Sequence, residues 1–194
     1  MKEFLKRKNI VFSAKRYGID ALGAMAQGLF ASLLIGTILN TVGLIPGLGF
    51  FARLGGYCTA VSGPAMAGAI AYALQAPPFV LFSSLAVGYA ANLLGGAGGP
   101  VATLLVTVAA VECGKAVSKE TKVDILATPF VTVFVGGGLA LLVAAPIGGF
   151  VMMIKDFISW AMTCQPFIMG ILVSVVIGMA LTLPISSAAI CAAL

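Results

Sequence analysis

Few side chains in this 194-residue protein could take part in chemistry, because 61% of its residues are hydrophobic and 9% are charged. Gln27, Asn92 and Glu112 are among the polar residues that interrupt its apolar stretches. A polar group is costly to bury in apolar surroundings, so each of these residues is a functional candidate. The sequence has no histidine, no metal-ligand cluster and no glycine–lysine loop typical of phosphate binding. We therefore expect no catalytic residue, no metal ion and no cofactor in this chain.

Asn92 lies one helical turn before a glycine-rich segment, 95–100, that includes Gly95 and Gly96. Backbone groups freed by a helix break could act with the Asn92 amide to hydrogen-bond the hydroxyl groups of a sugar. An amide contact between two helices is the alternative. Glu112 has two interpretations as well, because it could bind a polyol or pair with Lys115 three residues later. The tentative substrate-binding set is Gln27, Asn92, Gly95, Gly96 and Glu112.

These side chains lie within, or at the end of, long stretches that contain no charged residue. Residues 21–52, 54–111, 125–154 and 157–194 contain no Asp, Glu, Lys or Arg, whereas about 20 apolar residues span a bilayer. Backbone polar groups in hydrocarbon must be satisfied within their own segment, and the alternation typical of barrel strands is missing from the sequence. These features predict an all-α, polytopic membrane protein.

Proline and glycine residues divide the apolar stretches into about six predicted transmembrane helices. Breaks are expected at Pro46 and Gly47, at Pro77 and Pro78, and in the segment 95–100. The predicted helices cover residues 21–45, 56–76, 79–94, 101–117, 128–154 and 166–190. A re-entrant hairpin around the segment 95–100 is an alternative, because glycine-rich backbone is tolerated at membrane depth where protein buries it.

The distribution of basic residues predicts the orientation in the membrane. Six of the eleven basic residues precede the first apolar stretch: Lys2, Lys6, Arg7, Lys8, Lys15 and Arg16. Their expected partners are anionic lipid headgroups and not nucleic acid. With six spans and a cytoplasmic N-terminus, nine cations lie inside and two lie outside, as the positive-inside rule favours. We expect residues 1–20 to form a basic cytoplasmic or interfacial segment before a membrane domain of residues 21–194.

Small residues at four-residue spacing indicate where helices approach one another, because lipid supplies no hydrophobic drive for helix association. Three such stripes are present: Gly28, Ser32 and Gly36; Gly63, Ala67 and Ala71; Gly170, Ser174 and Gly178. The mixed-charge segment 112–128 is either a solvated inner loop or a docking surface for a soluble partner.

Four stretches in order carry a family resemblance. They are residues 17–30 (YGIDALGAMAQGLF), the glycine-rich segment through Pro100, residues 122–129 (KVDILATP) and residues 183–190 (LPISSAAI). Together they resemble the membrane-embedded IIC-type subunits of the bacterial phosphoenolpyruvate:sugar phosphotransferase system. The branch that includes perfringolysin-regulator-like proteins is the most similar.

The resemblance implies a protein of the bacterial plasma membrane that binds and translocates a sugar. It further implies a homodimer and separate soluble IIA and IIB subunits that supply the phosphate. A membrane-bound sensor that regulates gene expression is the alternative function, and a transporter unrelated to phosphate chemistry is a third. Members of the family are longer, and an apolar segment still runs at Leu194, so we expect this chain to be part of a longer protein.

Overall fold

The computed structural model describes residues 7–10, 13–120 and 123–161, together with positions 170, 174, 175 and 178. Every element within these described residues is helical, which agrees with the predicted all-α class. The elements are η1 (Arg16–Asp20), α2 (Ala21–Leu29), η2 (Phe30–Leu34), α3 (Ile35–Val42), α4 (Gly49–Ala60), α5 (Ser62–Ala73), α6 (Pro78–Gly95), η3 (Gly96–Gly98), α7 (Gly99–Val117), α8 (Asp124–Leu139), η4 (Ala140–Ala144) and α9 (Ala145–Ala161).

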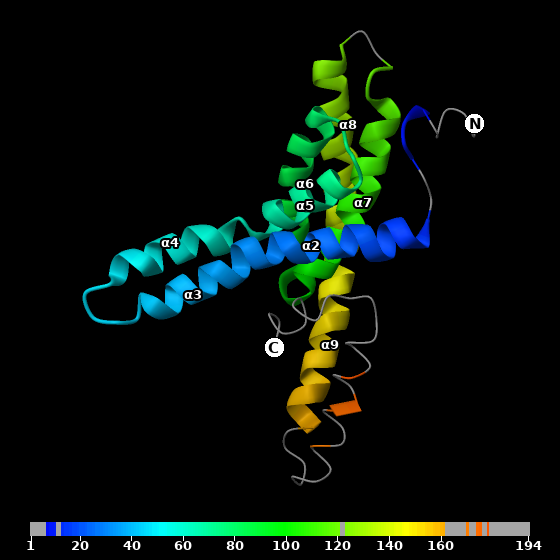
Figure 1. Cartoon of the computed structure of the whole chain (residues 1–194). Coiled ribbons are helices and arrows are strands. Elements are labelled where there is room, and N and C mark those ends of the chain that lie inside the picture. The colour runs from blue at the N-terminus through cyan, green and yellow to red at the C-terminus, as the bar shows by residue number, and fades with distance from the viewer. Residues whose placement is uncertain are drawn as a thin grey trace.

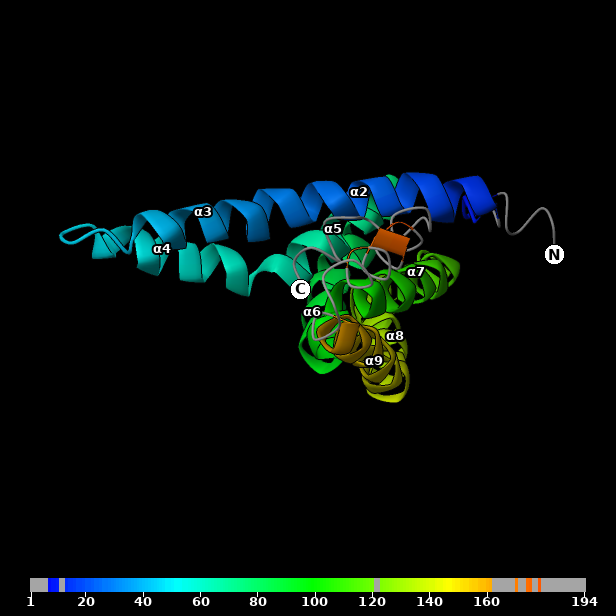
Figure 2. The same cartoon turned by 90° about the horizontal axis from the view of Figure 1, so that it is seen from below.

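A bundle of α6, α7 and α8 forms the centre of the molecule, and α5 packs against α6 and α7 (Figure 1). The elements η1 to α3 form one long helix that packs on α5 and crosses the bundle steeply (Figures 1 and 2). Helix α4 runs back along α3, so the α3–α4 pair projects from the bundle as an arm. Helix α9 continues α8 beyond the end of the bundle.

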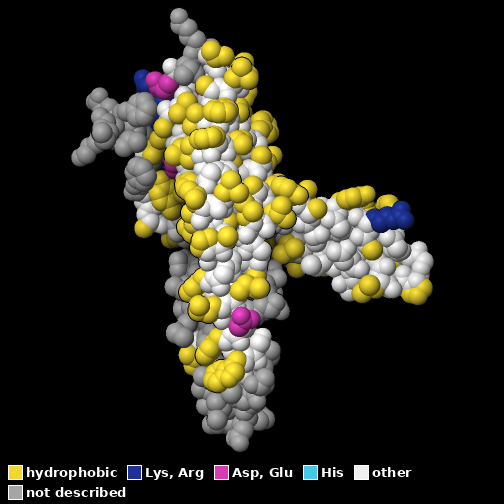
Figure 3. Space-filling view, turned by 180° about the vertical axis from the view of Figure 1, so that it is seen from behind, with side chains coloured by type: hydrophobic (Ala, Val, Ile, Leu, Met, Phe, Trp, Pro, Cys, Tyr) yellow, Lys and Arg dark blue, Asp and Glu magenta, His cyan; other side chains and the backbone are white. Residues whose placement is uncertain are grey.

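Three helical stretches are long enough and apolar enough to cross a membrane: Arg16–Val42, Pro78–Val117 and Asp124–Ile154. Hydrophobic side chains cover much of the bundle face drawn in Figure 3, where charged side chains are few. The stretch Pro78–Val117 folds back on itself, because Val80 lies close to Gly114 at one end and Gly95 lies close to Ala102 at the other. Helices α6 and α7 are therefore an antiparallel hairpin.

The glycine-rich turn of this hairpin requires its glycines. Gly96 has a φ of +50° and a ψ of −120°, a conformation that a side chain with a Cβ rarely adopts. The turn then docks on α9, where a Cβ on Gly148 would lie 2.5 Å from the carbonyl oxygen of Gly95. The predicted break in the segment 95–100 is thus confirmed as a tight reversal between two packed helices.

The single helix predicted over residues 56–76 is wrong. The structure has two helices there, α4 and α5, which meet at Val61 with φ −91° and ψ 10°. Pro64 provides the physical reason, since it has no N–H to donate to the carbonyl of Ala60. The break lets α4 pair with α3 while α5 packs on α2 and the bundle.

Two of the three predicted small-residue stripes mark close helix contacts. A Cβ on Gly28 would lie 2.5 Å from the carbonyl oxygen of Ala65, and one on Gly63 would lie 2.6 Å from that of Gly88. The first stripe therefore lets α2 approach α5, and the second lets α5 approach α6. In the third stripe, a Cβ on Gly170 or Gly178 would meet nothing within 4 Å among the residues that the structure describes.

Replacing Gly63 with Ala should destabilise the protein by about 1–3 kcal/mol, because the added methyl group must push α5 away from α6. Gly138→Ala is the matched control, since Gly138 lies in α8 with open space around the position of its Cβ. Thermal unfolding of the detergent-solubilised variants, followed by circular dichroism, measures both effects. Equal melting temperatures for the two variants would show that α5 and α6 do not touch at Gly63.

Candidate functional site

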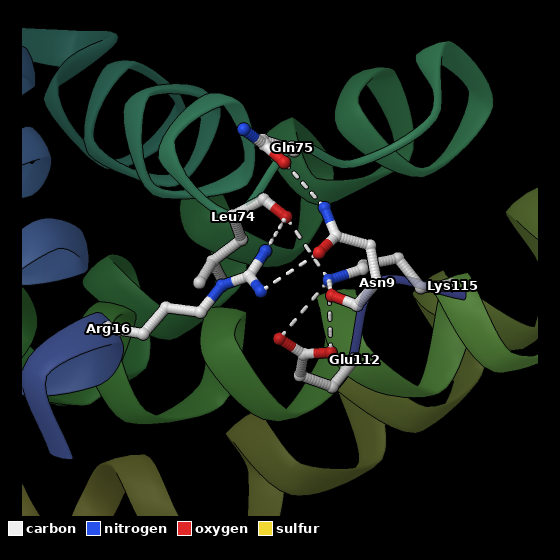
Figure 4. Close-up of polar contacts among 6 residues, drawn as sticks. All are labelled: Asn9, Arg16, Leu74, Gln75, Glu112 and Lys115. Atoms are coloured by element: carbon white, nitrogen blue, oxygen red, sulfur yellow. Dashed lines mark hydrogen bonds and ion pairs between the residues drawn. The ribbon is translucent and has the colours of Figure 1, made fainter. Parts of the chain in front are cut away.

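A buried lysine lies within the polar cluster that Figure 4 shows. Lys115 lies in the last turn of α7, and its side chain is 1% exposed. Its ammonium nitrogen donates to the carbonyl oxygens of Asn9, at 2.8 Å, and Leu74, at 3.1 Å. It also lies 3.2 Å from Oε2 of Glu112. These oxygens provide the partners that a buried ammonium group requires.

The predicted pair of Glu112 and Lys115 is confirmed. The two residues are three positions apart on α7, where helical side chains face one another. The pair is more buried than its predicted place near a surface suggested, because the Glu112 side chain is only 11% exposed. Tyr17, in η1, also interacts with the Glu112 carboxylate. The arrangement indicates a structural ion pair whose groups are already bound to one another.

The end of α5 explains why cations gather at this point. Leu74 caps α5, and the last carbonyl groups of a helix have no partner within the helix. Arg16 donates to the Leu74 carbonyl oxygen at 2.8 Å, so this oxygen accepts hydrogen bonds from two cations. Positive charge is favourable at a helix C-terminus because of the helix dipole.

Asn9 connects the N-terminal segment to the same helix end (Figure 4). Its Oδ1 accepts a hydrogen bond from Arg16 at 3.2 Å, and its Nδ2 donates to Oε1 of Gln75 at 2.5 Å. Asn9 has a φ of 54°, in the left-handed region that asparagine tolerates better than most residues. The N-terminal segment is thus attached to the turn between α5 and α6.

The segment after α7 completes this polar end of the molecule. Glu120 accepts from Arg7 at 2.5 Å and lies 2.6 Å from the ammonium nitrogen of Lys8. Lys8 also donates to the carbonyl oxygen of Ser118. The hydrogen bond from Lys8 is the main cause that holds the pKa of Glu120 below its ordinary value of 4.5, and Arg7 adds to it.

A cavity of about 550 Å³ lies where these three parts of the chain meet. Its walls come from residues 7–9, from Gln75 and Pro77, and from residues 115 and 118–120. Four of the lining residues are cations and one is a carboxylate, so the cavity is electropositive. In the described part of the chain, no group of three or more His, Cys, Asp and Glu residues could hold a metal ion. The chemistry that this arrangement favours is the binding of an anion.

The structure places the predicted site residues in different regions. Asn92, Gly95 and Gly96 lie at the turn of the α6–α7 hairpin, and the Asn92 amide donates to Oγ of Ser62 at 3.3 Å. That bond confirms the predicted alternative of an interhelical contact. Glu112 lies toward the other end of α7, about 20 Å from that turn at 1.5 Å per residue. Gln27 is exposed on α2.

Residues that sequence reasoning missed define the cavity and the buried cluster. The predictions did not single out Asn9, Gln75 or Ser118, and they treated Arg16 only as one of several N-terminal cations. Gln75 and Ser118 lie at the end of a predicted apolar stretch and Asn9 and Arg16 lie in the basic N-terminal segment, all on the side assigned to the cytoplasm. That shared position is the signal that could have identified them as a group.

Lys115→Met should destabilise the protein by about 3–5 kcal/mol, because it leaves the Glu112 carboxylate buried without its cation. Lys119→Met is the control, since Lys119 is exposed four residues later. Thermal unfolding in detergent measures the loss. The double variant Lys115→Met with Glu112→Leu should recover part of it, and the absence of any recovery would contradict a mutual ion pair.

The attachment of the N-terminal segment should depend on pH through Glu120. The pKa of Glu120 is lowered in the folded protein. Its carboxylate therefore contributes fully to the attachment above about pH 4.5, and this contribution is lost as the pH falls through the pKa of the folded state. Amide hydrogen exchange of residues 7–10, corrected for the intrinsic pH dependence, should therefore speed up below pH 4.5. The Glu120→Gln variant should exchange fast at every pH. Slow exchange in that variant would show that the segment is held without the carboxylate.

Comparison with known proteins gives one finding. Neither the curated proteins nor the solved structures compared with this chain give a match. A protein-family model described as "Phosphotransferase system, EIIC" matches residues 19–194. This range covers all the helices from α2 to α9. The family implies a membrane protein with a sugar substrate and soluble IIA and IIB partners. The chain therefore belongs to the EIIC family of the phosphotransferase system.

Proposed function

We propose that this protein is a membrane subunit that binds a sugar, translocates it and presents it to soluble subunits for phosphorylation. One observation carries the proposal beyond family membership. The N-terminal segment, the turn between α5 and α6 and the segment after α7 meet around one cavity. These are the three parts that the six-span topology assigns to the cytoplasm, where soluble IIA and IIB subunits would dock.

The proposed topology has six spans and a cytoplasmic N-terminus in the bacterial plasma membrane, with the second span broken at Val61 between α4 and α5. The α6–α7 hairpin supports two of these spans, because its helices are antiparallel and apolar. The long helix formed by η1 to α3 lies across the bundle and not along it (Figure 2), which constrains how the spans can be placed in the bilayer. The long helix and the hairpin cannot both follow the bilayer normal, so at least one of them must be tilted. The sixth predicted span, 166–190, lies largely outside the described residues.

The proposed sugar site is the turn of the hairpin, with Asn92, Gly95 and Gly96. Gly96 is exposed, and its left-handed conformation interrupts the helix, which frees backbone polar groups. The side chain of Asn92 lies one turn away and is only partly buried. Sugar hydroxyl groups are recognised by such amide and backbone groups. Gln27 and Glu112 belong to the original candidate set, but they do not lie at this turn.

A homodimer is part of the proposal. The α3–α4 arm carries exposed hydrophobic side chains, among them Ile38, Leu44 and Phe50. Inside the membrane, such an arm can lie against lipid or against a second copy of the chain. Arg53 on α4 is the charged residue of this arm.

Reconstitution tests the proposed function. The full-length protein is placed in proteoliposomes with its cognate soluble subunits and phosphoenolpyruvate, and labelled sugars are supplied from the opposite side. Accumulation of a phosphorylated sugar that depends on the membrane protein is the expected result. Accumulation that is the same in liposomes without the protein would contradict the proposal.

A pair of variants tests the sugar site. Asn92→Ala should raise the sugar KM about tenfold, because a buried hydrogen bond to the substrate is lost. Ser62→Ala is the matched control, since it removes the same Asn92–Ser62 bond and keeps the amide. Transport assays in proteoliposomes measure both. Equal increases in KM would show that Asn92 acts through helix packing and does not contact the sugar.

A further inference from the structure

We propose that the cavity between residues 7–9, 75–77 and 115–120 is a binding site for a phosphate group. This inference goes beyond sugar translocation, because the site lies at the opposite end of the α6–α7 hairpin from the proposed sugar site. The phosphate would belong to a soluble phosphate ester or to an anionic lipid headgroup, and the chemistry of recognition is the same for both.

The charge of the cavity favours an anion. Arg7, Lys8 and Lys119 line it together with Lys115, whose charge is already offset by Glu112, and Glu120 is the single carboxylate of the lining. That carboxylate already binds Arg7 and Lys8, which shows that an oxyanion fits between these two cations. A phosphate must displace this partly exposed carboxylate to reach the two cations, and it carries more charge and more acceptor oxygens than the carboxylate.

Ser118 gives the second, independent observation. Its side chain is 3% exposed, and its hydroxyl oxygen has no hydrogen-bond partner among the described residues. Such a buried, unsatisfied hydroxyl group costs free energy unless a ligand or water completes it. Ser118 lines the cavity, and its hydroxyl oxygen is buried, so the side chain must turn toward the cavity to donate to a phosphate oxygen bound there.

Lys119 is held in a strained backbone conformation at the same place. Its φ is 62°, in the left-handed region that lysine rarely adopts. The carboxylate of Asp124 accepts a hydrogen bond from the Lys119 N–H at 2.8 Å and stabilises this conformation. Strained residues cluster at binding sites, and the strain here accompanies a cation that lines the cavity.

The size and remaining walls of the cavity fit a small phosphate ester. A volume of about 550 Å³ lies within the range of sites for small molecules. The amides of Asn9 and Gln75 also line the cavity, and amides can hydrogen-bond the hydroxyl groups that accompany the phosphate.

Binding measurements on the purified full-length protein test the site without any transport assay. Isothermal titration calorimetry in neutral detergent measures the binding of two soluble probes, inorganic phosphate and glycerol 3-phosphate. The lipid source is tested in phosphatidylcholine nanodiscs with and without phosphatidic acid, where native mass spectrometry counts the retained phosphatidic acid. Saturable binding of a soluble probe, or retention of one phosphatidic acid per chain, is the expected result.

Two variants and two matched controls make the test specific. Ser118→Ala should weaken binding about tenfold, because one hydrogen bond to a charged ligand is lost. Lys119→Gln should weaken it by roughly fivefold or more, because one nearby charge is removed. Ser83→Ala removes an exposed serine of α6, and Arg53→Gln removes an exposed cation of the arm. Both controls should bind within about twofold of the parent protein.

Three results would overturn the proposal. They are no saturable binding from either source, equal binding by Ser118→Ala and the parent protein, and an equal loss in Arg53→Gln and Lys119→Gln. The last result would indicate diffuse attraction by the positive charge of the whole protein. Because no sugar is present, failure of this site leaves the proposed transport function standing, and failure of transport leaves the site standing.

Discussion

The arrangement of the described helices depends on the hydrogen bonds and the ion pair of the buried Lys115 ammonium group. This group binds oxygen atoms from three parts of the chain: Asn9 before η1, Leu74 at the end of α5 and Glu112 on α7. A buried cation is unfavourable unless such oxygens surround it. Any movement that separates the N-terminal segment, the α5–α6 turn and α7 would therefore leave a charge without partners.

This constraint gives the molecule two different ends. At one end, cations from the N-terminal segment and from the segment after α7 surround a cavity beside the capped end of α5. At the other end, the glycine-rich turn packs closely against α9 at Gly95 and Gly98, whereas Gly96 is exposed. Apolar helices join the two ends, and close contacts at glycines such as Gly63 and Gly28 hold them together. A membrane subunit that receives a substrate from one side and soluble partners from the other requires such a polarity.

The sequence was sufficient where one residue or one short segment decides the structure. Charge-free stretches predicted the helices, the segment 95–100 predicted a reversal, and the three-residue spacing predicted the pair of Glu112 and Lys115. It was insufficient where partners come from distant parts of the chain. The carbonyl oxygen of Leu74 is a backbone atom that no residue type reveals, and the break at Val61 depends on helix packing as well as on Pro64. The grouping of Asn9, Gln75 and Ser118 is likewise a property of the tertiary fold.

The three segments around the cavity should share one side of the membrane, and the turn of the hairpin should lie on the other. Single cysteines at Gln75, Lys119 and Ala97, in a protein without its natural cysteines, test it with a membrane-impermeant maleimide. In intact spheroplasts, the cysteine at position 97 should react and those at 75 and 119 should not, and inverted vesicles should give the opposite pattern. Reaction of all three cysteines from the same side would contradict this topology.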